Sequence, residues 1–153
     1  MLPKSLAIDI LNESVRWDQG QIFTIAGFLA KYTLHDSHWL GLHLDTSWDG
    51  DATAIIAFDP IWNQIGVGRT PLTSKWPILL IRFPAISAIN LSEYKDIGGV
   101  QRGISGAESE KAGNEETKTI ISDHYGGQVI VIHQDPVRVL CFTATGERIE
   151  LKA

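Results

Sequence analysis

The chain has 153 residues, of which 44% are hydrophobic and 20% charged, a composition typical of one folded domain and not of a disordered chain. Its one cysteine excludes a disulfide framework and a cysteine-rich zinc site. The net charge is −5 and the thirteen basic residues are scattered, which disfavours nucleic acid and anionic membrane surfaces as partners. We therefore expect a single globular domain over residues 1–153.

The N-terminal segment does not read as a signal peptide, because Asp9 and Glu13 interrupt its apolar residues. Apolar runs such as residues 78–81 are too short to span a bilayer. These patterns predict a cytoplasmic protein with no membrane segment. Neither standard nucleotide-binding loop is present, and we expect no cofactor.

Three elements are predicted in the first third of the chain. Residues 4–14 place Leu6, Ile10 and other apolar residues on one stripe, which predicts an amphipathic helix. Residues 21–34 are rich in β-branched and aromatic types and predict a long strand, in which Gly27 indicates a bulge or bend. Alternation of leucine over residues 39–44 predicts a second strand that forms a hairpin with the first.

The rest of the chain predicts further short strands separated by turns. They cover residues 52–58, 78–83, 129–133, 137–143 and 148–151. Three prolines and two glycines predict a long loop over residues 60–77, and residues 86–94 fit neither a helical nor a strand period. Residues 117–125 are interpreted as one or two helical turns.

Residues 96–116 predict a flexible, glycine-rich and charged loop. The segment has almost no large apolar residue to anchor it, so disorder is preferred over a functional flap. Together these elements predict an α+β, mainly β fold, in which an N-terminal helix packs on a small curled antiparallel sheet or barrel.

Residues 5–33 resemble the opening of small OB-fold proteins. In those proteins a short helix, here Ser5-Leu6-Ala7-Ile8-Asp9-Ile10-Leu11-Asn12, precedes a turn and a long bent strand. That strand would be Gly20-Gln21-Ile22-Phe23-Thr24-Ile25-Ala26-Gly27-Phe28-Leu29, with the glycine where the barrel curls. The resemblance implies a five-stranded barrel that binds oligonucleotides, oligosaccharides or proteins.

Two clusters of histidines and acids could suggest metal sites, but we interpret both as solvated polar residues. His35, His38 and His43 lie close in sequence, but the third is about 16 Å along the predicted strand, too far for one ion. Asp45, Asp49 and Asp51 surround Gly50 without the spacing or the final glutamate of an EF-hand loop. We expect solvated turns and no metal at either place.

Two further residue sets suggest nucleophilic chemistry. Ser105, Asp123 and His124 are the residue types of a hydrolase triad, but the serine is not in a G-x-S-x-G elbow and the other two are adjacent. Cys141 lies in an apolar strand, which favours an inert core thiol over a nucleophile.

The tryptophans are the most informative residues. Trp48, Trp62 and Trp76 lie in predicted loops, where they either plug the ends of the fold or anchor a partner or flat ligand. With His43 they are the candidate binding residues. We expect a non-catalytic module that binds another protein, either an acidic inhibitor or immunity-type protein or one that self-associates into a dimer.

Two other classes of function remain open at this point. An enzyme or small-ligand binder would use the loop tryptophans as walls and residues 96–116 as a lid, with His43, His124 and His133 as polar groups. A nucleic-acid-binding barrel would need Lys31, Arg69, Lys75 and Arg82 on one stripe.

Overall fold

A computed structural model describes residues 2, 4–46, 50–59, 78–92, 103–124, 126–143 and 146–151. Most of the described elements are strands, as the sequence predicted. In chain order the elements are α1 (Lys4–Leu11), the 3-10 turn η1 (Trp17–Gln19), β1 (Gln21–Phe23), α2 (Ile25–Lys31), β2 (His38–Asp45), β3 (Thr53–Asp59), β4 (Ile78–Phe83), β5 (Ala88–Ser92), β6 (Ile104–Lys111), β7 (Thr117–Asp123), β8 (Gln128–His133), β9 (Val137–Phe142) and β10 (Arg148–Ile149).

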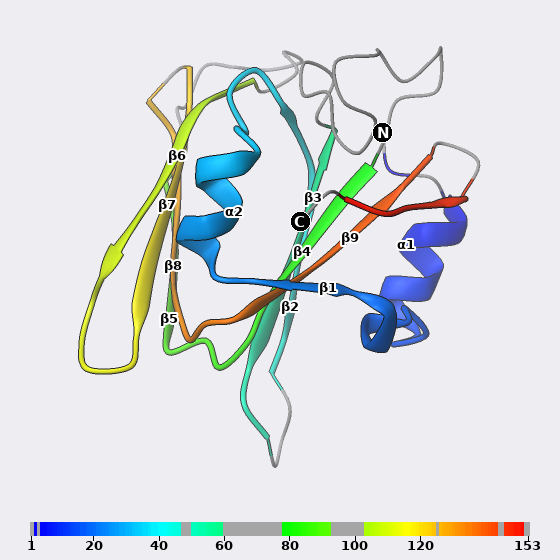
Figure 1. Cartoon of the computed structure of the whole chain (residues 1–153), viewed down its shortest axis with the longest axis horizontal. Helices are drawn as coiled ribbons and strands as arrows, with labels where there is room; N and C mark the ends of the chain where they lie inside the picture. The colour runs from blue at the N-terminus through cyan, green and yellow to red at the C-terminus, as the bar shows by residue number, and fades with distance from the viewer. Residues whose placement is uncertain are drawn as a thin grey trace.

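The strands form two antiparallel sheets. Sheet A has the order β1-β9-β4-β3-β2, with β10 beside β9, and sheet B has the order β5-β8-β7-β6. Helix α2 lies between the sheets and α1 lies on the other side of sheet A (Figure 1). The mainly β class and the N-terminal helix are therefore confirmed.

Sheet A is buried on both faces, and alternation along its strands supplies two separate cores. In β4, Leu79, Ile81 and Phe83 face α2 and sheet B, whereas Ile78 and Leu80 face α1. Strands β3 and β9 divide their residues in the same way. Continuous apolar runs such as residues 78–81 are thus the signature of a two-sided strand, and their prediction as strands is confirmed.

The predicted long strand over residues 21–34 is wrong, because the chain forms β1 and then helix α2. The hydroxyl of Thr24 accepts the backbone N–H of Gly27 at 3.1 Å and caps the helix. The carboxylate of Asp135, distant in sequence, accepts the N–H of Ile25 at 2.9 Å. Gly27 therefore lies in the first helical turn and marks no strand bulge.

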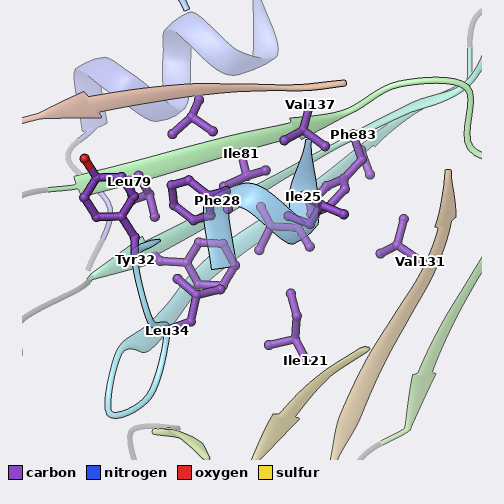
Figure 2. Close-up of a cluster of buried hydrophobic side chains, with 14 of the residues drawn as sticks. Ile25, Phe28, Tyr32, Leu34, Leu79, Ile81, Phe83, Ile121, Val131 and Val137 are labelled. Carbon is purple, nitrogen blue, oxygen red and sulfur yellow. The ribbon is translucent and has the colours of Figure 1, made fainter. Parts of the chain in front are cut away.

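Helix α2 is amphipathic, and it buries one side between the sheets. Ile25, Phe28 and Tyr32 recur at helical spacing and pack against residues such as Ile81 of sheet A and Ile121 of sheet B (Figure 2). The same β-branched and aromatic residues that predicted a strand thus satisfy the helical period.

The structure does not confirm the OB-fold. The resemblance depended on a long bent strand over residues 20–29, but residues 21–23 form the short β1 and residues 25–29 belong to helix α2. The two sheets, as far as the chain is described, do not close into a barrel. Strand β1 pairs with β9, and β2 pairs with β3, so the predicted hairpin between residues 21–34 and 39–44 is also wrong.

The described part of the predicted flexible loop is ordered as a hairpin. Residues 104–111 form β6, which pairs with β7, and residues 93–102 lie outside the described residues. The predicted helical turns over residues 117–125 are wrong, because residues 117–123 form β7 between β6 and β8. Ladder hydrogen bonds use backbone groups, so small and charged residues can form a strand when a neighbour fixes it.

A short seam joins the two sheets at one end. The N–H of Asp36 donates to the carbonyl of Ile104 at 2.8 Å, and the N–H of Ile104 donates to the carbonyl of Ser37 at 2.8 Å. His38 and Gly103 form an isolated bridge beside these bonds. Neither helix has the length or apolar character needed to cross a bilayer.

Candidate functional site

The largest hollow described is a groove on the outer face of sheet A, with a volume of about 420 Å³, which we call the outer groove. One wall is the end of α1 and the chain that follows it, including Ile10, Glu13 and Trp17. Ile55 of β3 is in its floor, and Asp45 at the end of β2 lines the other side together with Gly50 and Asp51 before β3.

Helix α1 positions the first wall of the outer groove. Its residues Leu6 and Ile10 pack on the outer core of sheet A, which fixes the helix on this face. The helix ends at Leu11, and Glu13 takes the left-handed φ of 55° as the chain turns. The 3-10 turn then brings Trp17 back to the sheet.

The floor of the groove carries a histidine, His43, and an arginine, Arg82, in one cross-strand row. His43 of β2 pairs with Ile55 of β3, which pairs with Arg82 of β4. The Arg82 guanidinium lies 5.8 Å from the centre of the Trp17 ring, a cation–π contact. The backbone carbonyl of Trp17 accepts a bond from Arg138, the next residue in that row, at 3.2 Å.

Three carboxylates line the same groove without a cationic partner among the described residues. They are Glu13 after α1, Asp45 at the end of β2 and Asp51 before β3. By contrast, the nearby Asp18 accepts two bonds from Arg16, and this hydrogen bonding lowers the pKa of the Asp18 carboxyl. The outer groove therefore places three carboxylates, without a cationic partner among the described residues, around a floor that holds Ile55, His43 and Arg82.

A smaller apolar groove of about 210 Å³ adjoins the outer groove along the edge strand β2. Leu2, Ala7 and Leu11 form one side, and Leu42 lies on the other. His43 and Ile55 line both hollows, so the two grooves meet at His43. Leu11, a large apolar side chain in this groove, is 69% exposed.

His43 is the one predicted binding residue that the structure describes. It lies in the groove, and its imidazole makes no hydrogen bond to another described residue. Trp48, Trp62 and Trp76 lie outside the described residues. Two other tryptophans line hollows instead: Trp17 in the outer groove, and Trp39 in a cleft between the sheets.

That cleft has a volume of about 320 Å³ and lies between the edge strands β2 and β5. Trp39 packs against Phe58, with ring centres 5.6 Å apart, and Leu91 faces the cleft from β5. The lining is mostly apolar, and Ser92, Asp123 and Gln128 are its polar members.

The predicted histidine set is divided between two places. His43 lies in the outer groove, whereas His35 and His38 lie at the seam. There the Asp36 carboxylate contacts His35 Nδ1 at 3.1 Å and His124 Nε2 at 3.2 Å. Within the described ranges, no three histidine, cysteine or acidic side chains are arranged to hold a metal ion.

His38 stands opposite Asp59, the last residue of β3, near the seam. His38 Nδ1 and one Asp59 carboxylate oxygen are buried and have no hydrogen-bond partner among the described residues. Burial raises the pKa of the Asp59 carboxyl, and the nearby His38 acts in the opposite direction.

The side chains of the considered triad do not form a relay. The Ser105 hydroxyl donates to the backbone carbonyls of Ser122 and Asp123, each at 3.1 Å. The Asp123 carboxylate accepts the N–H of Gly127, and His124 contacts Asp36. The serine therefore has no histidine base.

His133 and Cys141 belong to the core and not to a site. The imidazole of His133 is fully buried between the Thr119 hydroxyl, 2.7 Å from Nε2, and the Gln134 carbonyl, 2.8 Å from Nδ1. Burial lowers its pKa, so the ring is neutral, with Nδ1–H donating and Nε2 accepting. Burial also raises the pKa of the Cys141 thiol to about 12, which makes it inert.

The predicted basic stripe is not formed by its two described members. Lys31 ends α2 between the sheets, whereas Arg82 faces the opposite side of sheet A beside Trp17. Arg69 and Lys75 lie outside the described residues.

Sequence reasoning had named Asp45, Asp51 and Arg82 only for other kinds of site, and it missed Glu13 and Trp17. The available signal was their position directly after an amphipathic helix, where the chain must turn back toward the sheet. No family model, curated protein or solved structure matches the chain.

Proposed function

We propose that the protein is a non-catalytic binding module whose outer groove takes an extended, basic segment of another protein. The observation that carries the proposal is the set of three carboxylates, Glu13, Asp45 and Asp51, that line this groove without a cationic partner among the described residues. The net charge of −5 acts in the same direction, because it attracts a basic partner over a longer range.

The neighbouring apolar groove supports an extended partner. It continues the outer groove along β2, whose residues 41–45 have one described neighbour strand, β3. A segment lying there can bury Leu11 and offer backbone groups to a free strand edge, a common mode of peptide recognition. Leu44, beside this edge, is 41% exposed.

The chemistry of the groove favours binding over catalysis. Burial raises the pKa of Cys141 and lowers the pKa of His133, and both residues lie in the core and not in the groove. The described serine candidate, Ser105, has its hydroxyl bonded to backbone carbonyls. The carboxylates in the groove are suited to bind cationic side chains of a partner.

The test selects ten-residue peptides from a displayed random library against the purified protein, and then measures their affinity by fluorescence anisotropy. We expect the selected peptides to be basic. Combined Glu13→Gln, Asp45→Asn and Asp51→Asn substitutions should weaken binding by roughly tenfold or more, and added salt should weaken binding to the wild type.

The matched control removes the same charge from sheet B, by Glu108→Gln, Glu110→Gln and Glu115→Gln. These carboxylates belong to the β6–β7 hairpin and not to the outer groove. Selection of peptides without basic residues, or equal losses in the two triple variants, would contradict the proposal.

A second candidate function is the binding of a small anionic ligand in the same groove. It is favoured by the volume of about 420 Å³, which lies in the usual range for ligand sites, and by Arg82, which has no carboxylate partner among the described residues. Calorimetric titration with benzoate tests it: binding that Arg82→Gln abolishes would support this function, and no heat at millimolar benzoate would count against it.

A further inference from the structure

The free edges of the two sheets differ in how they are protected. An edge strand exposes unpaired backbone groups that can pair with another chain, and proteins usually block it with charges, bulges, proline or short length. In the described part of the chain, the strand order ends at β1 and β2 in sheet A and at β5 and β6 in sheet B, and the two-residue β10 lies beside β9.

Three of these edges carry protective features. Strand β6 has a register shift between Ile104 and Gly106 and three charged residues in Glu108–Lys111. Strand β2 is protected only at its start, where it has a register shift between Trp39 and Gly41 and its first residue bridges to Gly103. Strand β1 has only three residues.

Strand β5 has none of these features. Its sequence, Ala-Ile-Asn-Leu-Ser, contains no charge and no proline, and its five pairs with β8 run without a register shift. Four of its five residues are exposed, and Leu91 is 57% exposed. Ile89 is the exception, since it packs against the main core.

We propose that β5 is a self-association edge, and that two copies of the chain pair antiparallel through it about a two-fold axis at Asn90. This inference does not depend on the outer groove, which lies on the other sheet. In this register Asn90 faces Asn90 of the second copy, and Ile89 faces Leu91 of the second copy. The two four-stranded sheets then form one continuous sheet.

The register is self-complementary on both faces of the strand. Ile89 and Leu91 lie on the inner side, beside the core residues Val131 and Val129 of β8, so each Leu91 gains an apolar cross-strand neighbour. Asn90 lies on the outer side beside Ile130, where two amides can hydrogen-bond to each other.

The charge distribution allows two copies to approach at this edge. In the outer row that runs from Asn90 through Ile130 and Ile120, the first charge is Glu108 on β6. It lies three strand spacings away, about 14 Å, which exceeds the Debye length of about 8 Å at physiological salt. The carboxylate of Glu116 bonds to Ser87, outside the paired residues.

The interface is small, so the dimer is expected to be weak. A five-residue strand pair buries much less than the roughly 1,600 Å² of a standard interface. We expect a dissociation constant on the order of 10 μM to 1 mM, because affinities of this order accompany small interfaces.

Sedimentation velocity from about 10 μM to 1 mM protein tests the proposal with Asn90→Lys and Asn90→Asp. We expect the wild type to dimerise as concentration rises, and each variant alone to stay monomeric because like charges meet at the two-fold axis. An equimolar mixture of the two variants should restore the dimer, since lysine then faces aspartate. Restoration also shows that both variants are folded.

The matched control is Ser122→Lys on β7, which adds the same charge to the same outer face away from the edge. It should dimerise as the wild type does. A wild type that stays monomeric at 1 mM, or a dimer that persists in Asn90→Lys, would overturn the proposal. A mixture that remains monomeric while the control dimerises would overturn the register about Asn90.

Discussion

The buried imidazole of His133 predicts a specific pH dependence of folding stability. Its ring is fully buried, packs 4.8 Å from the Phe83 ring centre, and has both nitrogens in hydrogen bonds. Burial lowers its pKa, so the folded protein leaves the ring neutral at a pH where the unfolded chain protonates it.

The sign and the size of the effect follow from proton linkage. Because the folded pKa is depressed, the His133 contribution is fully present above the unfolded value of 6.5 and declines as pH falls below it. One proton bound only by the unfolded chain costs about 1.4 kcal/mol per pH unit. Between pH 7.5 and 5.5 the free energy of unfolding should therefore fall by up to about 1.4 kcal/mol.

The assay is urea unfolding followed by tryptophan fluorescence at pH 7.5, 6.5 and 5.5, for the wild type and His133→Gln. Glutamine does not titrate, so the difference between the two proteins should shrink toward low pH by that amount. The raised pKa of Asp59 affects both proteins equally and cancels.

The control is Phe28→Leu, which weakens core packing without removing a titratable group and should keep the wild-type pH dependence. Equal pH slopes in the wild type and His133→Gln would refute the reasoning. If His133→Gln does not fold, the imidazole resonances of the wild type replace it: a His133 signal that titrates near pH 6.5 in the folded protein would refute the reasoning as well.

Two further predictions concern the core. Phe28→Ala should lower the free energy of unfolding by about 3–5 kcal/mol in urea titrations, because Phe28 is fully buried between the sheets and its loss leaves a cavity, whereas Phe28→Leu should cost clearly less. Cys141 should react with a thiol reagent at pH 8 at least about 100-fold more slowly in the folded protein than in urea, since burial raises its pKa to about 12, and fast labelling of the folded protein would contradict its core position.

Much of sheet A was predictable because its strands are buried on both faces. A strand such as β4 must then be apolar at nearly every position, which a local pattern reveals without knowledge of its partners. Strands β3, β8 and β9 were found for related reasons, since each alternates or runs apolar between clear turn residues.

Strand β6 was missed because its residues carry little local signal, whereas the β-branched residues of β7 were misinterpreted as helical turns. Glycine, serine, alanine and glutamate predominate in β6, so its sequence resembles a flexible loop. Its hydrogen bonds are made to β7, and β7 is fixed in turn by β8. A backbone ladder of this kind is decided by the neighbour and not by the strand's own side chains.

The candidate site was only partly predictable for a similar reason. His43 was identified as a polar residue on an otherwise leucine-rich strand, and it does line the outer groove. Glu13, Asp51 and Arg82 come from separate segments, and each alone is an ordinary surface charge. Their common location depends on α1 packing across the sheet.

The sequence by itself determined the mainly β class, the N-terminal helix, the acidic balance and an inert core thiol, because these follow from composition and from the local alternation of apolar residues. Only the tertiary structure decided that residues 25–31 are a helix and where the charges gather. Intrinsic helix and strand preferences differ by less than about 1 kcal/mol per residue. Burial of a residue such as Phe28 between two sheets, with Asp135 accepting the helix's first N–H, outweighs such a preference.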